Sequence, residues 1–353
     1  MTEESVRFID IGMRFGATVA LAGINLSITE GSYVVLLGPS GGGKTTLLNI
    51  LGGFLEPTSG RIEIKGEDMA GVPAAKRPTA TVFQDYALFP HMNIAGNVAF
   101  GLKMRKVPRA ARESRVSKAL DMVELGHVAQ HRVHELSGGQ RQRVALARSL
   151  VVEPSVLLLD EPLGALDLKL RRQMQDELKA IQKRVGTTFV HVTHDQEEAM
   201  AIADTIVVMN KGSIEDVGAP ERVYLRPATR FTANFMGESN ILTGRVTEVS
   251  GDFVTVATEN TKLTVRGTAP VDHEVAISIR PEHLHTEDKS GRAQLGTGHV
   301  TEYGFRGTHH QCTARMERFD TPLRVRLPQS KIPSSGERLT LYVDPDDAVL
   351  LDR

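Results

Sequence analysis

The chain has 353 residues, of which 24% are charged and 41% hydrophobic, and its formal net charge is −1 at pH 7. This length exceeds that of a usual single domain, so we expect two domains. The near-neutral charge gives no electrostatic case for a nucleic-acid partner, which normally requires a basic patch. The single cysteine, Cys312, excludes an internal disulfide and suits a reducing cytosol.

Short strands and a glycine-rich loop are predicted in residues 1 to about 85. Residues 33–37 form an apolar run and residues 47–51 begin a helix-like run, so the glycines lie between a strand and a helix. The loop and its first helical residues are Gly38, Pro39, Ser40, Gly41, Gly42, Gly43, Lys44, Thr45 and Thr46. Glycines let the backbone curl around phosphates, Lys44 should reach the outer phosphates, and the Thr45 hydroxyl should ligate Mg²⁺. Thr46 would add a further phosphate contact.

Helices are predicted from about 86 to 155, where residues 110–125 carry apolar side chains three and four positions apart. This segment contains the string LSGGQRQR at residues 136–143. Two glycines that follow a serine and precede a helix offer free N–H groups at a helix N-terminus, where the dipole favours an anion. The plainer alternative is a serine N-cap followed by two loop glycines. The phosphate loop upstream favours the first interpretation, with phosphate bound by Ser137, Gly138, Gly139 and Gln140.

Residues 156 to about 236 again alternate between strand and helix patterns, which predicts a parallel sheet. The apolar run 156–159 ends in Asp160 and Glu161, at the sheet edge where ligands of open α/β sheets gather. We expect Asp160 to hold the Mg²⁺ shell and Glu161 to polarise the attacking water. A solvated strand end or a helix N-cap is the alternative for an isolated acidic pair.

The sequence changes character after residue 237. Short apolar runs at 253–256, 275–279 and 339–343 are bounded by Gly, Pro and Asp, as in a small β-barrel. We expect this tail either to act as a regulatory domain or to serve only for dimerisation and stability. The choice stays open because such barrels host unrelated functions.

The ordered series of motifs resembles the ATPase subunits of ABC importers, in the subfamily of maltose, ferric-iron and polyamine importers. The resemblance implies an α/β P-loop NTPase of the ABC type at 1–237, with a helical subdomain at about 86–155. It implies a C-terminal all-β, OB-like (TOBE-type) barrel at 238–353, in which residues 280–284 match a recurring R-P-E-x-L segment. ATP and Mg²⁺ are the implied ligands.

The resemblance assigns roles to four further residues. Gln84 would contact Mg²⁺ or water and link to the membrane partner, and Asp167 would cross the dimer interface. His194 matches a switch histidine that contacts the γ-phosphate. Phe15 stands where relatives carry an aromatic residue that stacks on adenine, usually Tyr or Trp. Gly164 replaces a serine common in relatives, so any contact from that hydroxyl is absent.

The resemblance also implies partners. ATP would lie between the phosphate loop of one subunit and the signature of the other, so a homodimer is expected. Residues 86–97 of this chain would receive a cytoplasmic helix from each of two transmembrane permease subunits. A periplasmic or lipid-anchored solute-binding protein would deliver the solute. The sequence shows no stretch of roughly 18 apolar residues and no basic, apolar start at residues 1–4, so we expect a peripheral protein at the cytoplasmic face of the inner membrane.

The transported solute is the least determined point. Residues 89–94, 97–102 and 303–307 look most similar to spermidine/putrescine importer ATPases. Ferric iron, phosphonate and sugar stay open, because the solute contacts the binding protein and the permeases rather than this chain. A soluble ABC ATPase not coupled to transport is an alternative of another class, although such proteins usually carry two cassettes or a long coiled-coil insertion. A P-loop kinase would have no reason to contain LSGGQ at 136–140.

Overall fold

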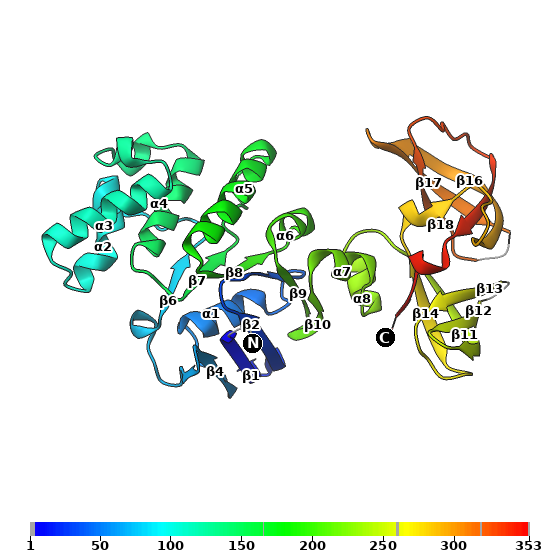
Figure 1. Ribbon diagram of the computed structural model, residues 1–353, viewed down its shortest axis with the longest axis horizontal. Helices are drawn as coiled ribbons and strands as arrows, with labels where there is room; N and C mark the ends of the chain where they lie inside the picture. Colours follow the sequence, from blue (N-terminus) through cyan, green and yellow to red (C-terminus); the bar gives the residue numbers. More distant parts are fainter. Residues whose placement is uncertain (1–3, 165, 259–260, 318–319, 352–353) are drawn as a thin grey trace. The chain divides into compact units, whose positions relative to one another are not determined.

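The computed structural model describes residues 4–164, 166–258, 261–317 and 320–351 (Figure 1). The chain separates into two compact units, Met1–Pro220 and Glu221–Arg353. Each unit has its own hydrophobic core. Among the residues described, no helix is both long enough and apolar enough to span a bilayer.

A six-stranded sheet forms the centre of the first unit. Its strand order is β10-β9-β3-β8-β7-β6, and all neighbours pair in parallel except β10, which is antiparallel to β9. Its strands are β3 (Tyr33–Leu37), β6 (Thr79–Val82), β7 (Val156–Asp160), β8 (Thr188–Thr193), β9 (Thr205–Asn210) and β10 (Ser213–Gly218). Every residue of β3 and β8 is buried, as expected for central parallel strands that are covered on both faces.

Helices cover both faces of this sheet. Figure 1 shows α1 (Lys44–Gly52) on one face and α5 (Leu168–Val185) and α6 (Gln196–Ile202) on the other. A four-stranded antiparallel sheet of order β2-β1-β4-β5 shares a core with α1. Its strands are β1 (Glu4–Phe15), β2 (Thr18–Thr29), β4 (Ser59–Ile64) and β5 (Glu67–Asp68). The layered α/β fold predicted from the alternating patterns is therefore present.

Three helices form a separate part of the first unit (Figure 1). They are α2 (Ile94–Met104), α3 (Arg109–Met122) and α4 (Gly138–Leu150). Pro108 occupies the N-cap position of α3, and the Asn93 side chain accepts a hydrogen bond from the Gly96 amide at the start of α2. These helices lie within the segment for which the sequence predicts a helical subdomain.

The second unit contains two β-structures around one core. A closed barrel has the strand order β11-β12-β13-β20-β14, and a five-stranded sheet has the order β15-β19-β16-β17-β18. The barrel consists of β11 (Asn240–Ser250), β12 (Phe253–Ala257), β13 (Lys262–Arg266), β14 (Glu274–Ile279) and β20 (Ala348–Leu351). The sheet consists of β15 (Leu284–His285), β16 (Ala293–Phe305), β17 (His309–Met316), β18 (Leu323–Pro328) and β19 (Arg338–Val343).

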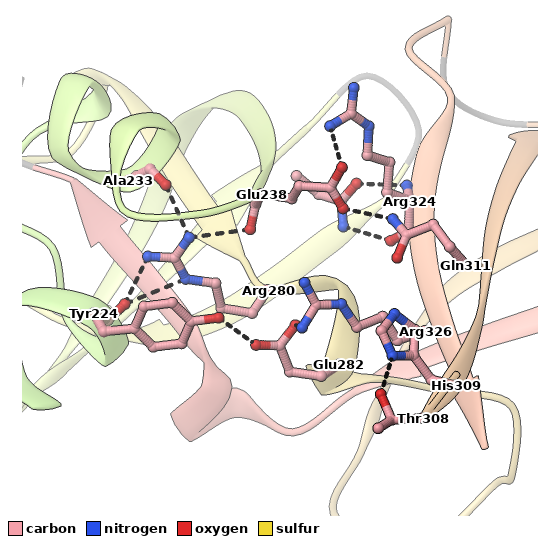
Figure 2. Close-up of polar contacts among 11 residues, drawn as sticks. Tyr224, Ala233, Glu238, Arg280, Glu282, Thr308, His309, Gln311, Arg324 and Arg326 are labelled. Carbon is pink, nitrogen blue, oxygen red and sulfur yellow. Dashed lines mark hydrogen bonds and ion pairs between the residues drawn. The ribbon is translucent and has the colours of Figure 1, made fainter. Parts of the chain in front are cut away.

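A buried arginine ties the helices α7 (Pro220–Leu225) and α8 (Arg230–Phe235) to the barrel (Figure 2). Arg280 is 3% exposed and donates hydrogen bonds to the backbone carbonyls of Tyr224, Ala233 and Glu238 at 2.7 to 3.2 Å. Its guanidinium also lies 4.2 Å from the centre of the Tyr224 ring. Because these contacts bind α7 and α8 to the barrel, the unit begins near residue 221, whereas the sequence patterns place the boundary at 237/238.

Candidate ATP site

The loop between β3 and α1 has the backbone that a phosphate cradle needs. Gly41 and Gly43 have φ values of 78° and 97°, a left-handed conformation that side chains disfavour. A Cβ atom at Gly38 would lie 2.1 Å from the Met209 carbonyl oxygen, so only glycine fits there. The loop leads directly into the N-terminus of α1, where backbone N–H groups and the helix dipole favour an anion. Lys44, Thr45 and Thr46 form the first residues of that helix.

Lys44 is held against the loop that precedes it. Its side chain is buried, and its Nζ donates to the carbonyl oxygens of Gly38 and Pro39, both at 2.8 Å. Burial lowers the pKa of Lys44, while the Glu161 and Asp160 carboxylates raise it. Because an ammonium group has three N–H donors, one is left for a phosphate oxygen.

Thr45 and Asp160 come together at the end of β7. The Thr45 hydroxyl donates to Asp160 Oδ1 at 3.4 Å. Burial raises the pKa of Asp160, and the Thr45 hydrogen bond opposes this effect. A hydroxyl and a carboxylate beside a phosphate cradle are oxygen ligands of the kind that Mg²⁺ prefers. The residues present therefore fit a magnesium ion bound together with a nucleotide.

Glu161 and His194 form a second pair next to this site. Glu161 Oε1 lies 3.3 Å from His194 Nδ1, and the Glu161 amide donates to the Val192 carbonyl at 3.0 Å. Glu161 has a φ of 45°, a left-handed conformation that is unfavourable for a residue with a side chain. The His194 side chain is 63% exposed and that of Glu161 29%, so both remain accessible to a ligand and to water.

The motifs do not predict a buried polar network that reaches Thr193, the residue before His194. The Tyr33 hydroxyl contacts His191 Nδ1 at 2.9 Å, and His191 Nε2 lies 3.0 Å from Glu198 Oε1. Thr193 donates to the other Glu198 oxygen at 2.6 Å. Burial and the Glu198 charge raise the pKa of Tyr33 well above its usual range, so the hydroxyl stays protonated and is able to donate a hydrogen bond to His191 Nδ1.

This buried polar network holds the end of β8, directly before His194. Burial raises the pKa of Glu198, but the combined effect of His191 and Thr193 is larger and lowers it. The pKa of Glu198 is therefore below its usual value, and the carboxylate stays ionised. The Thr193 hydroxyl also accepts a hydrogen bond from the Asp195 amide at 3.1 Å. Both neighbours of His194 are thereby held. The signal in the sequence is His191, a polar residue between two valines of a buried strand.

The signature residues form the N-terminus of α4. The Ser137 hydroxyl accepts from the Gln140 amide at 3.3 Å, and the Gln140 side chain accepts from the Ser137 amide at 2.9 Å. This reciprocal pair is a capping box, so the serine N-cap interpretation describes the local geometry. Gly138 and Gly139 follow as the first helical residues, which leaves their N–H groups at the positive end of the helix. Capping and phosphate binding are thus compatible.

The remaining predicted residues lie at exposed positions. Asp167 is the N-cap of α5 and accepts from the Leu170 amide at 3.0 Å. Gln84 lies in the turn that follows β6, and Phe15 ends β1 with half of its surface exposed. The structure therefore brings Lys44, Thr45, Asp160, Glu161 and His194 toward one site. It places the signature on the helical part of the same unit, at the start of α4 (Figure 1).

This fold and this site define an ATP-binding cassette ATPase. The family model described as "ABC transporter" matches residues 21–164, and the model described as "TOBE domain" matches residues 277–351. The chain belongs to the ATP-binding proteins of ABC transporters and is an ATPase. The predicted fold class, an ABC ATPase domain followed by a TOBE-type β domain, is confirmed.

Similar curated proteins share one name, "Spermidine/putrescine import ATP-binding protein PotA". The protein of Thermobifida fusca is 54% identical over 76% of this chain and 70% of its own length. That of Methylococcus capsulatus is 48% identical over 98% of this chain and 94% of its own length. That of Acetivibrio thermocellus is 42% identical over 99% of this chain and 96% of its own length. The similarity therefore extends over both units.

Two solved structures share the fold of the first unit. One is cbiO1 from Clostridium perfringens, part of the ABC transporter complex cbiONQ, with a TM-score of 0.58 and 32% identity over 63% of this chain and 90% of that one. The other is a dimeric post-hydrolysis state of an ATP-binding cassette bound to ADP and Pi, with a TM-score of 0.54 and 32% identity over 61% of this chain and 98% of that one.

Proposed function

We propose that this chain is the ATPase subunit of an ABC importer that takes up the polyamines spermidine and putrescine. The observation that carries the proposal is the similarity to polyamine-import ATPases over 98 to 99% of the chain, at 42 to 48% identity. Because unrelated activities can share a fold, a match that includes the C-terminal unit is stronger support than the cassette alone. Import of ferric iron, phosphonate or a sugar is the runner-up.

The proposed roles of Lys44, Thr45, Asp160, Glu161 and His194 are supported by their positions, and those of Phe15 and Gln84 are carried over from the family resemblance. The phosphate loop and Lys44 would bind the ATP phosphates, with Phe15 stacked on the adenine. Thr45, Asp160 and Gln84 would hold Mg²⁺, which neutralises phosphate charge when it is bound. Glu161 would orient the attacking water and accept its proton, and His194 would contact the γ-phosphate. The 3.3 Å contact between Glu161 and His194 supports a shared task for this pair.

Hydrolysis in this proposal requires two copies of the chain. ATP would lie between the phosphate loop of one copy and Ser137, Gly138 and Gly139 of the other, with Asp167 at the interface. The position of the two signature glycines at the start of α4 supports this, because their N–H groups lie at a helix N-terminus. A solved relative that is a dimer bound to ADP and Pi supports it further.

The importer would also contain two permease subunits and a solute-binding protein, with this chain peripheral at the cytoplasmic face of the cell membrane. Residues 86–97 would receive a cytoplasmic helix from each permease. A pocket beside α2 supports this placement, because it includes residues from the end of that segment. Its apolar lining comes from Ala95, Ala99, Val116, Leu120 and Ala129. Closure of the ATPase dimer would then move the permease helices.

Affinity purification of the tagged chain from its native membrane tests the assembly. We expect two multi-spanning permeases and a solute-binding protein to co-purify, and recovery to increase when Glu161→Gln is combined with ATP. The matched control is Glu197→Gln, an exposed acid on α6, which should recover the same amount as the unmodified chain. Recovery of ribosomal or DNA-repair proteins in place of permeases would contradict the transport proposal and leave the ATPase chemistry intact.

A further inference from the structure

Two histidines and two aspartates meet in the second unit, away from the sequence segments of the ATP site. His283 ends the short helix η4 (Pro281–His283), and His285 ends β15. β15 pairs with β19 so that His285 lies opposite Tyr342, which brings it beside the segment that follows β19. That segment contains Asp344 and the short helix η5 (Pro345–Asp347). Backbone pairing thus holds groups together that are far apart in the sequence.

The side chains of these residues converge. His285 Nε2 lies 3.4 Å from Asp344 Oδ2, and His283 Nδ1 lies 3.5 Å from Asp347 Oδ1. One possible ligand atom from each of His285, Asp344 and Asp347 lies within 4.8 Å of the other two. His283 Nδ1 and His285 Nε2 are both shielded from solvent, and within the described part of the chain neither nitrogen has a hydrogen-bond partner. Each of these buried nitrogens therefore faces a carboxylate without a proper hydrogen bond.

Such a contact is favourable when a positive charge lies between its two atoms. An imidazole lone pair and a carboxylate oxygen repel one another unless a proton or a metal ion lies between them. A charge-assisted hydrogen bond would bring the atoms to about 2.7–2.9 Å. A tetrahedral ion with bonds of about 2.0–2.1 Å separates its ligand atoms by roughly 3.3 Å. The observed separations of 3.4 and 3.5 Å match the spacing across a metal ion. They differ from the 3.3 Å contact of His194 with Glu161 because these histidine nitrogens are buried and have no hydrogen-bond partner among the described residues.

We propose that His285, Asp344 and Asp347 bind one divalent transition-metal ion of the Zn²⁺ type, with water in the fourth position and His283 in contact with Asp347. Imidazole and carboxylate ligands in a set of this size favour Zn²⁺ over Ca²⁺ and Mg²⁺, which take more oxygen ligands.

Arg292 belongs to the surroundings of this site. Its Nε lies 3.2 and 3.4 Å from the two oxygens of Asp344. A carboxylate oxygen accepts more than one partner, so Arg292 can orient Asp344 while that group binds an ion. The bound ion would connect the segment after β14 with the segment before β20 and so stabilise the fold of the second unit. Its role would be structural and would not depend on the proposed transport function.

Titration of the untagged, metal-free full chain with Co²⁺, in the absence of nucleotide, tests the proposal. We expect one equivalent to bind with the intense visible bands of a tetrahedral N/O site and without sulfur charge transfer, because Cys312 is not a ligand. Zn²⁺ should displace the Co²⁺ and raise the melting temperature. His285→Gln and Asp347→Asn should each weaken Co²⁺ binding on the order of 10²-fold or more, and the double variant should do the same.

Two variants serve as controls in this titration. His299→Gln removes a half-exposed histidine of β16, and Asp160→Asn alters the proposed nucleotide-linked magnesium site. Both should bind Co²⁺ like the unmodified chain. Absence of the tetrahedral spectrum from the unmodified chain would overturn the proposal, whether or not the variants fold. Undiminished binding by the folded double variant His285→Gln/Asp347→Asn would overturn it as well.

Discussion

Replacement of Glu161 by glutamine should lower ATP turnover by a factor on the order of 10² to 10⁴, the range for loss of a general base. Glutamine keeps the size and hydrogen-bonding shape of the side chain but cannot take a proton from water. The phosphate cradle, Lys44 and the Thr45–Asp160 contact remain, so ATP should still bind. Phosphate release measures turnover, and light scattering with ATP present should find the trapped dimer.

The control for this variant is Glu197→Gln, which removes the same charge from the exposed surface of α6. Glu197 has 79% of its side chain exposed, and its 3.9 Å contact with Arg172 is weak. Its turnover should match that of the unmodified chain. Undiminished turnover in Glu161→Gln would remove Glu161 from the proposed mechanism, and loss of nucleotide binding would mean that its role is structural.

Replacement of Gly138 by aspartate should abolish most ATP turnover without unfolding the chain. A Cβ atom at Gly138 would lie 3.6 Å from Leu166 Cδ2, which is ordinary van der Waals contact. An acidic side chain at a helix N-terminus is favourable, so the melting temperature should stay unchanged or rise by up to about 2 °C. In the closed dimer, however, the same charge would face the ATP phosphates. We expect a loss on the order of 10²-fold or more.

Ala110→Asp provides the matched control, because it adds one negative charge to the exposed first turn of α3. It should leave turnover unchanged. This result would show that the loss in Gly138→Asp depends on where the negative charge lies and not only on the added charge. Mixed dimers give a second readout. A Gly138→Asp chain combined with a Lys44→Ala chain should retain one intact composite site, whereas neither variant alone should. Equal activity of Gly138→Asp and the unmodified chain would contradict the proposed composite site.

Much of the first unit could be predicted from local patterns. The glycine loop lies between a strand and a helix, so the position of Lys44 and Thr45 at the start of α1 follows from their order in the chain. Asp160 ends a fully apolar run, and the carboxyl ends of parallel strands meet at one edge of a sheet. The contact between Thr45 and Asp160 is therefore a consequence of topology.

Other features depend on tertiary contacts that have no local signature. Tyr33, His191 and Glu198 come from β3, β8 and α6, and only their packing reveals the buried polar network that they form. Arg280 binds carbonyls of α7 and α8, which joins these helices to the second unit although their sequence continues the first. His285 and Asp344 meet because β15 pairs with β19, a register that the two residues of β15 cannot specify alone.

Polyamine uptake by intact cells is the most direct test of the proposed function. Uptake of labelled spermidine and putrescine would be measured in the native organism after deletion of this chain, with the unmodified chain or Glu161→Gln returned at equal abundance. We predict that deletion abolishes uptake, that the unmodified chain restores it, and that Glu161→Gln does not. Unchanged polyamine uptake in the deletion strain, together with loss of uptake of iron, phosphonate or a sugar, would contradict the proposed substrate.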